Sequence, residues 1–316
     1  MLISSMVLLA AGCVAAPISP PAPALGTPEA AASGAPPAAP GCDVVPALSK
    51  AGADRDAAYS ALDAAGRSQI LLTLPDCLEN PDPAIRDGYA FEMSALILRG
   101  GDTDEAAVRT LMTGLLDRLA RAGEDPNGFR GPFAALALAE VARVDRITPF
   151  LSEEERWDLL MAAAGYLEGL TDYRGFSDTE GWRHGIAHTA DLLMQMSLNP
   201  HLTKPQAEVI LSAIASQAGP IGHAYIFGES DRLAAPVIYL AFKETFTAEE
   251  WSAWFLSLWP PEDPLRETAY TSEAALTRLH NLRAFTHAVY VSAVASNDER
   301  LKPVAGAAFE FLNLLP

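Results

Sequence analysis

The residues best suited to do chemistry in this sequence lie in one short and otherwise apolar segment. The stretch GWRHGIAHTADLLMQM, residues 181–196, places two of the six histidines of the chain one helical turn apart. On a helix of 3.6 residues per turn, its polar side chains fall within an arc of about 60°. These side chains are His184, His188, Asp191 and Gln195. No Lys, Arg or Glu occurs from residue 184 to residue 200, so we expect a mostly buried helix with a thin polar stripe.

Three interpretations of this stripe are open at the level of sequence. Histidines at positions i and i+4 can hold one metal ion, as His184 and His188 would, with Asp191 as a third ligand. The same side chains can instead form hydrogen bonds to neighbouring helices or to a bound polar ligand. They can also be ordinary core residues with local partners, because buried polar groups are almost always paired.

Further polar side chains gather in three other places. They lie on the approach to the stripe at residues 170–182, and again at residues 228–236 and 278–290. The candidate ligand-binding side chains there are Asp172, Arg174, Trp182, Glu229, Asp231, Arg232, Asn281 and Arg283. A surface loop, an acidic helix start or a solvated stripe would give the same patterns. Whether the three clusters meet depends on the fold.

The elements that must position these side chains are helices. From about residue 48 the apolar residues recur with a helical period and without sustained two-residue alternation, which predicts helices and no strands. Capping boxes mark helix starts at Asp102 with Glu105, Ser152 with Glu155, Thr203 with Gln206 and Thr247 with Glu250. Ser177 or Asp178 is expected to cap the helix that carries the stripe. The pattern predicts roughly a dozen antiparallel-paired helices, arranged as a HEAT-like α-solenoid or an α/α array.

Two segments indicate internal repetition. LSEEERWDLL at residues 151–160 and FTAEEWSAWF at residues 246–255 share a cap, an acidic first turn and a tryptophan at the start of the apolar face. The second segment belongs to an aromatic set made of Trp251, Trp254, Phe255 and Trp259. Such a set could form a stacking surface for sugars, but its helical spacing favours the core.

The first residues predict export. A short apolar run ends at AAGC, residues 10–13, which resembles the lipobox of bacterial lipoproteins, whose cysteine, here Cys13, carries the lipid. Residues 14–41 hold eight prolines, ten alanines and a single charge, a composition typical of an extended tether. We expect a signal peptide at residues 1–13, a tether at 14–41 and one helical domain at 42–316. A lipid anchor would then hold the domain at the bacterial cell envelope, facing the periplasm or the cell surface.

The two remaining cysteines fit an oxidising compartment. Cys42 and Cys77 can form a disulfide or stay as two buried thiols. A disulfide would close a loop of about 35 residues and stabilise the domain by on the order of 3 kcal/mol. The formal net charge is −18, from 22 basic and 40 acidic residues. This excess of acid argues against nucleic acid as a partner, because phosphates are bound by clustered Lys and Arg.

Four segments resemble a known family. YLEGLTDYRGF, GWRHGIAHTADLL, GESDRL and NLRAF resemble, in this order, the bacterial family called domain of unknown function 2785. The resemblance covers roughly residues 80–295 and depends mainly on the block RGF followed by GWxHxxAHxxD. It implies an all-helical, solenoid-like fold, and it carries no reaction with it.

The sequence therefore predicts a membrane-tethered helical-repeat protein. Its cleft, lined by His184, His188, Asp191 and Gln195, would bind a polar small molecule or a peptide or protein segment. One alternative is a metal-dependent hydrolase that holds a divalent metal with the same residues, with Glu229 or Asp231 as general base. The other is a structural scaffold of the cell envelope without catalysis.

Overall fold

The computed structural model describes Cys42, Ala57 and residues 59–316. These residues belong to one compact unit, Ala38–Pro316. The predicted signal peptide at residues 1–13, including Cys13, and the tether at residues 14–41 lie outside the described residues. The described part is almost entirely helical, which confirms the predicted all-α class. Within that part, no helix combines the length and the apolar character needed to cross a bilayer.

The longer helices follow one another with short connections. They are α2 (Ala64–Thr73), α4 (Glu92–Gly100), α5 (Glu105–Ala120), α6 (Arg130–Ile147), α7 (Glu153–Gly169), α8 (Gly185–Ser197), α9 (Lys204–Ala218), α10 (Glu229–Ala241), α11 (Ala248–Leu258), α12 (Glu273–Ser296) and α13 (Lys302–Leu314). Shorter helical turns include η2 (Leu74–Glu79), α3 (Pro83–Ile85) and η3 (Arg86–Phe91). One hairpin, β1 (Phe176–Ser177) with β2 (Gly181–Trp182), lies between α7 and α8. The sequence did not predict it, because strands of two residues are too short to show alternation.

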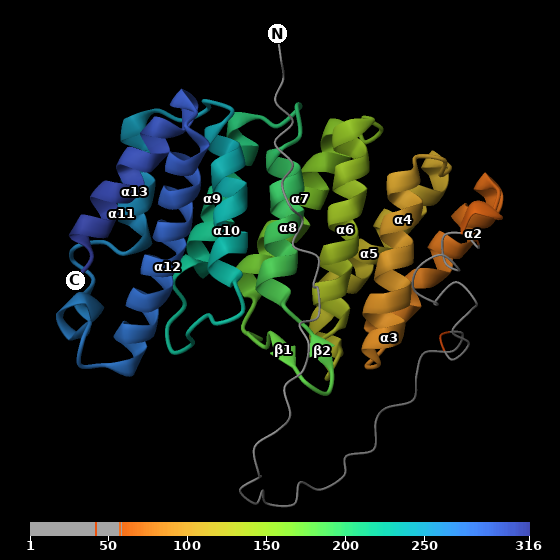
Figure 1. Ribbon diagram of the computed structural model, residues 1–316, viewed down its shortest axis with the longest axis horizontal. Helices are drawn as coiled ribbons and strands as arrows, with labels where there is room; N and C mark the ends of the chain where they lie inside the picture. Colours follow the sequence, from red (N-terminus) through yellow and green to blue (C-terminus); the bar gives the residue numbers. More distant parts are fainter. Residues whose placement is uncertain (1–41, 43–56, 58) are drawn as a thin grey trace, which may run out of the picture. The chain divides into compact units, whose positions relative to one another are not determined.

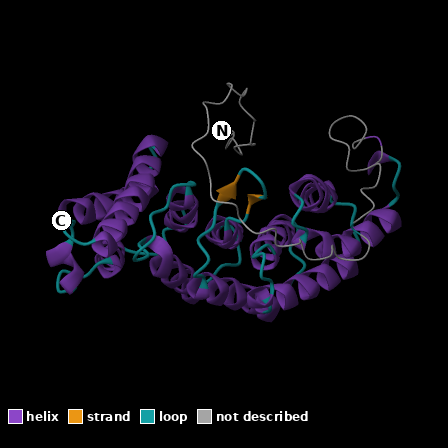
Figure 2. Cartoon of the chain, turned by 90° about the horizontal axis from the view of Figure 1, so that it is seen from below, coloured by secondary structure: helices purple, strands orange, loops and turns teal. Residues whose placement is uncertain are grey.

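The helices form two rows, one of even-numbered and one of odd-numbered helices. In the first row each helix packs against the next, from α4 through α6, α8 and α10 to α12. The second row runs from α5 through α7, α9 and α11 to α13 in the same way. Figure 1 shows the even-numbered helices side by side, and Figure 2 shows the same part of the chain from below. This regular stacking of antiparallel helix pairs confirms the predicted helical array.

The helix starts follow the predicted caps with one exception. The capping boxes at Ser152, Thr203 and Thr247 are formed. The box predicted at Asp102 is wrong, because α5 takes Asp104 as its N-cap residue. The carboxylate of Asp102 instead accepts a hydrogen bond from Arg67 at 2.8 Å.

The predicted core role of the aromatic set is confirmed. Trp251, Phe255 and Trp259 are buried. Trp254 is half-buried, and its indole N–H donates to the carbonyl of Leu211 at 3.1 Å. The two repeated segments open α7 and α11, which both lie in the odd-numbered row. Trp251 of α11 is buried between stacked helices, whereas its counterpart in α7, Trp157, is 38% exposed, so the two segments share a sequence pattern but not the role of the tryptophan.

Cys42 and Cys77 form a disulfide. Their Cα atoms lie 5.4 Å apart across a sequence separation of 35 residues. The bond ties Cys42 to η2, and both cysteines are buried against the same apolar core. In the chain-entropy model, closing a loop of this length stabilises the fold by about 3 to 4 kcal/mol.

Candidate ligand-binding site

Two loops meet beside the first residues of α8 and α10, on the side of the array where β1 and β2 lie. The first, residues 170–184, joins α7 to α8, and the second, residues 219–228, joins α9 to α10. The rings of Tyr173 and His223 stack across the two loops at 4.8 Å, and Trp182 meets Phe227 edge-on at 5.9 Å. A Cβ atom at Gly175 would collide with the ring of Phe227. Only glycine therefore allows the loops to approach this closely.

Buried amide side chains hold both loops in place. Gln217 is 3% exposed, donates to two carbonyls at the end of α7 at 2.9 and 3.1 Å, and accepts from the Tyr173 hydroxyl at 3.3 Å. Asn281 on α12 accepts from the Tyr225 N–H at 2.9 Å and donates to the His223 carbonyl at 2.7 Å. Burying such groups is favourable only when they are paired. All of these partners except the Leu167 carbonyl of α7 lie in the two loops, so these side chains fix the shape of the loops.

A pair of buried arginines clamps the hairpin to the start of α6. The guanidinium groups of Arg86 and Arg183 lie over the ring of Phe129, at 4.0 and 4.4 Å from its centroid. Arg86 donates to the Glu180 carbonyl at 2.7 Å, and Arg183 pairs with the Glu180 carboxylate at 3.0 Å. Arg183 also donates to the Asn127 carbonyl at 2.6 Å. The β1–β2 turn is thus anchored by charge-assisted hydrogen bonds on its core side.

Between the two loops lies a pocket of about 570 Å³, which we call the hairpin pocket. It is lined by Thr171, Asp172, Tyr173, Arg174, Gly175, Phe176, Ser177, Glu180, Arg183, His223 and Phe227. Two arginines and two carboxylates make its formal charge zero, and aromatic rings supply apolar walls. The pocket therefore offers donors, acceptors and apolar surface together, as binding sites for polar ligands do.

Two of the predicted side chains, Asp172 and Arg174, lie in this wall. The Arg174 Nε donates to Asp172 at 2.8 Å, and the backbone N–H of Arg174 donates to the same carboxylate at 3.1 Å. Burial tends to raise the pKa of Asp172, but the hydrogen bonds and charge of Arg174 outweigh it and lower the pKa. The carboxylate is therefore held in its charged form beside a half-exposed guanidinium.

His184 lies beneath the pocket rather than on the predicted helix face. It precedes α8 in the left-handed conformation, with φ 55°, so neither Ser177 nor Asp178 caps this helix. Its ring stacks on Trp182 at 4.7 Å, and its Nε2 has no hydrogen-bond partner and lies 3.8 Å from the Glu229 carboxylate. Burial, with a smaller contribution from the charge of Arg232, lowers the pKa of His184 to about 4.

Of the other members of the stripe, His188 and Asp191 are buried between helices of the even-numbered row, and Gln195 is half-buried. His188 packs edge-on against Phe133 of α6 at 5.2 Å, and burial lowers its pKa well below the usual value. Both Asp191 oxygens contact the Arg232 Nη1, at 2.5 and 2.6 Å. Burial raises the pKa of Asp191 to about 6, against the opposing effect of Arg232. Gln195 accepts from Arg146 at 3.1 Å. None of the four side chains of the stripe lines the hairpin pocket.

The stripe does not form a metal-ligand cluster. In the part of the chain that the structure describes, no three His, Cys, Asp or Glu side chains are placed to hold a metal ion. Asp191 is occupied by Arg232, and Glu229 accepts from the Phe227 N–H at 2.9 Å. Asp231 is exposed. The described residues therefore do not form the set of metal ligands that the alternative of a metal-dependent hydrolase requires.

The structure brings together only part of the three polar clusters. Asp172, Arg174 and Trp182 meet the loop that Glu229 and Asn281 hold in place. Arg283 points elsewhere, because its guanidinium donates to the carbonyl of the C-terminal Pro316. Sequence reasoning missed Gln217, which lies at the end of α9, and His223 and Phe227, which lie in the following loop without unusual polarity. A usable signal was the glycine at position 175, which makes room for Phe227.

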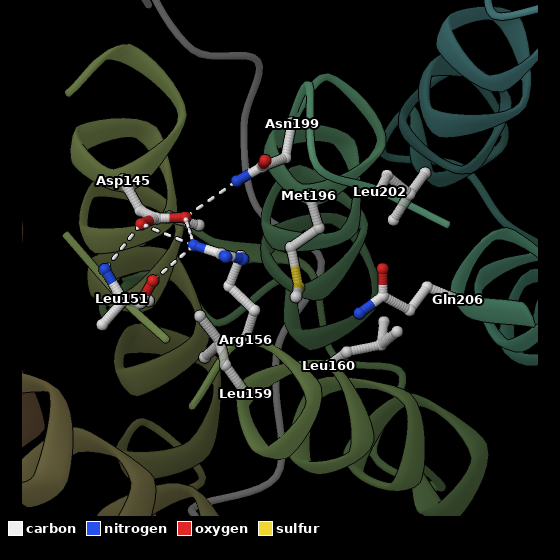
Figure 3. A pocket seen from close by; sticks show the side chains of 10 residues that line it. Asp145, Leu151, Arg156, Leu159, Leu160, Met196, Asn199, Leu202 and Gln206 are labelled. Atoms are coloured by element: carbon white, nitrogen blue, oxygen red, sulfur yellow. Dashed lines mark hydrogen bonds and ion pairs between the residues drawn. The ribbon is translucent and has the colours of Figure 1, made fainter. Parts of the chain in front are cut away.

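A second buried polar cluster lies at the opposite end of the same helices. Asp145 accepts from the backbone N–H of Leu151 at 2.8 Å and from Asn199 at 2.8 Å, and it pairs with Arg156 at 3.3 Å (Figure 3). The cavity beside it measures about 20 Å³, which is room for about one water molecule. We call this region the closed end and the region of the hairpin pocket the open end. The closed end has no space for a ligand.

Comparison with known proteins identifies the family of the chain. The model of a family described as protein of unknown function (DUF2785) matches residues 115–291, which is more than half of the chain. The matched range contains every residue that lines the hairpin pocket. No curated protein and no solved structure matches the chain. The family match confirms the resemblance seen in the sequence, and the chain belongs to the DUF2785 family.

Proposed function

We propose that this protein is a binding protein whose ligand, a polar molecule or a segment of a partner protein, occupies the hairpin pocket. One observation carries the proposal. Gln217, Asn281 and Arg183 are all buried, and each has a hydrogen bond that fixes one of the two loops: Gln217 to the Leu170 carbonyl, Asn281 to the Tyr225 N–H, and Arg183, itself in the first loop, to the Asn127 carbonyl. A loop held by buried polar groups keeps its shape before a ligand arrives, which lowers the entropic cost of binding.

The charges of the pocket indicate what kind of ligand fits. The whole chain has a formal charge of −18, whereas Asp172, Glu180, Arg174 and Arg183 cancel inside the pocket. A lone cation or anion would meet both attraction and repulsion there. A neutral or zwitterionic ligand with both donors and acceptors satisfies all four side chains. The exposed ring of Phe176 favours a ligand that also has an apolar part.

We also propose that the protein acts at the cell envelope, tethered through Cys13. The lipobox-like AAGC at residues 10–13 and the Pro/Ala-rich stretch that follows support this location. The disulfide between Cys42 and Cys77 supports it as well, because such bonds persist in oxidising compartments. Feeding cells a clickable fatty acid is expected to label the wild-type protein in the membrane fraction. Loss of the label in Cys13→Ser is the expected control, and an unlabelled wild-type protein would contradict the tether.

The test of binding compares two matched arginines. Arg174 and Arg300 each pair with the aspartate two residues earlier, through the same three N–H groups, and their side chains are 50% and 47% exposed. Only Arg174 lines the hairpin pocket. The full-length, ¹⁵N-labelled protein is titrated with single amino acids, tripeptides and common monosaccharides, and amide resonances of both loops are followed.

The expected result is that at least one class of probe shifts the resonances of residues 171–177 and 223–227. Arg174→Ala should weaken this response, and Arg300→Ala should leave it unchanged. A response from no probe, or one that Arg174→Ala does not affect, contradicts binding in this pocket and favours a structural scaffold.

A further inference from the structure

One continuous stretch of backbone forms most of the wall of the hairpin pocket. Seven consecutive residues, 171–177, line it. One edge of this stretch is already paired: Phe176 lies opposite Trp182 in the antiparallel hairpin. The pairing continues beyond β1, since the N–H of Arg183 donates to the Gly175 carbonyl at 2.8 Å. The N–H of His184 donates to the Arg174 carbonyl at 3.1 Å. Residues 174–177 therefore act as a strand with β2 on one side.

The beginning of the same stretch has unpaired backbone groups. Within the described part of the chain, neither the N–H nor the C=O of Thr171 and Tyr173 has a hydrogen-bond partner. The backbone N–H of Asp172 likewise has none, although its side chain is occupied by Arg174. A strand edge with free donors and acceptors is a template onto which another strand can add.

We propose that this edge accepts an extended peptide segment of a partner protein, which lies in the hairpin pocket and pairs with the backbone of residues 171–173. The inference rests on the proposed binding function and names the class of ligand. The free N–H and C=O groups of Thr171 and Tyr173 are two residues apart, which is the repeat along one edge of a strand, and strand addition is a common mode of peptide recognition. The charged and aromatic walls of the pocket would receive alternate side chains of the segment, because side chains alternate along a strand.

The space beside the edge is elongated, which favours an extended segment over a compact molecule. A second hollow of about 210 Å³ adjoins the hairpin pocket. The two hollows share Thr171, Asp172 and Arg183 as walls. The room for a ligand thus follows the unpaired part of the strand, and a segment bound there would run past Thr171 toward the end of α7.

The first experiment removes one backbone donor. Random dodecapeptides displayed on phage are selected on the full-length protein, and the affinities of the enriched peptides are measured for Thr171→Pro and its control Thr171→Val. Proline removes the N–H of residue 171, and Thr171→Val controls for the loss of the hydroxyl. Proline suits this position because Leu170 already has φ −67° and ψ 126°, which a following proline favours. We expect Thr171→Pro to weaken binding about tenfold and Thr171→Val to change it less than about twofold.

The second experiment does not depend on the folding of a variant. Each residue of an enriched peptide is N-methylated in turn, and the affinity for the wild-type protein is measured. Strand pairing predicts a large loss at every second position and little loss between, because alternate N–H groups point toward the partner strand. Peptides whose binding depends on Arg174 but is insensitive to Thr171→Pro and shows no two-residue period would overturn strand addition and leave the binding function intact. Failure to enrich any peptide sensitive to Arg174→Ala would overturn strand addition, and the probe titration then decides the binding function separately.

Discussion

The closed end and the open end, which lie at opposite ends of the same helices, both bury polar side chains. The polar groups are paired at the closed end, whereas two imidazole nitrogens remain unpaired at the open end. At the closed end the carboxylate of Asp145 receives hydrogen bonds from two backbone N–H groups, from Asn199 and from Arg156. The cavity beside it is about 20 Å³. At the open end the imidazole Nε2 atoms of His184 and His223 are buried without partners, next to loops that enclose about 570 Å³.

The difference shows that buried polarity alone does not mark a functional site. Both clusters follow from the same need, since helices in stacked rows must be joined and the joints carry polar backbone. The closed end uses the short connections α6–α7 and α8–α9. Asp145 accepts from two backbone N–H groups of the first connection and from the Asn199 side chain of the second. The open end uses longer connections, and its polar side chains fix the shape of the loops beside a hollow. Unpaired groups beside a hollow, rather than paired groups in a core, indicate the binding site.

The largest expected loss of stability comes from a substitution at the closed end. Asp145 is 1% exposed, and Asp145→Ala leaves Arg156 and Asn199 without their partner and two backbone N–H groups unpaired. Removing one partner of a buried ion pair typically costs about 3 to 5 kcal/mol, so the free energy of unfolding should fall by about that amount. Urea unfolding measures the loss. A loss below about 1 kcal/mol would mean that the closed end does not stabilise the fold as described.

A smaller effect is expected at the open end when the pH falls. Burial lowers the pKa of His184 to about 4 and that of His188 well below its usual value. The unfolded chain therefore binds protons near pH 6.5, whereas the folded chain resists protonation of His184 until about pH 4. Stability should fall across this window, by on the order of 3 kcal/mol for His184. Urea unfolding at a series of pH values measures the slope.

Two variants separate the pH dependence of stability that comes from His184 from the opposite dependence that comes from Asp191. Burial raises the pKa of Asp191 to about 6, so its contribution to stability is lost as the pH rises through that value. His184→Gln should flatten the loss of stability between pH 6.5 and 4, and Asp191→Asn should steepen it. A slope that His184→Gln leaves unchanged would show that His184 is not held neutral by burial.

Loss of Gln217 is expected to loosen the open end without unfolding the protein. Gln217→Ala frees two carbonyls at the end of α7 and the Tyr173 hydroxyl from their partner. Unsatisfied buried groups cost about 1 to 3 kcal/mol. Hydrogen exchange should become faster in residues 171–177 and 219–227 and stay unchanged around Asp145. Equal acceleration at both ends would contradict the view that Gln217 acts on the loops.

The rows of helices were predictable from sequence because their determinants are local. Apolar periodicity and capping boxes such as Ser152 with Glu155 act within one helix. The arc of His184, His188 and Asp191 was predicted from an ideal helix, but His184 stands outside α8 in the left-handed conformation. One residue of non-helical backbone places its ring against Trp182 instead of in line with the stripe.

The hairpin pocket was only half predictable for the same reason. Asp172 and Arg174 are polar, close in sequence and not needed for capping, so they could be found. Phe227 and His223 reach the site from a loop about 50 residues further along, and only the packing of α8 against α10 brings them there. Contacts set by tertiary packing leave no period in the sequence.

The substitution with the smallest expected effect on stability, Arg174→Ala, tests the difference between the two ends most directly. Arg174 is half-exposed, and exposed ion pairs contribute between about 0 and 1 kcal/mol, so Arg174→Ala should change the free energy of unfolding by no more than that. If the open end is a binding site, the same substitution should still abolish or strongly weaken the binding of any peptide or probe that the wild-type protein recognises. Arg300→Ala removes the same Asp-x-Arg arrangement outside the pocket and should change neither property.

Stability and binding would then be separable. Asp145→Ala lowers stability and leaves the specificity of the pocket unchanged in the folded fraction, whereas Arg174→Ala weakens binding and leaves stability nearly unchanged. If Arg174→Ala and Arg300→Ala have the same effect on binding, the hairpin pocket is not the binding site, and the polar side chains of the open end only stabilise its loops.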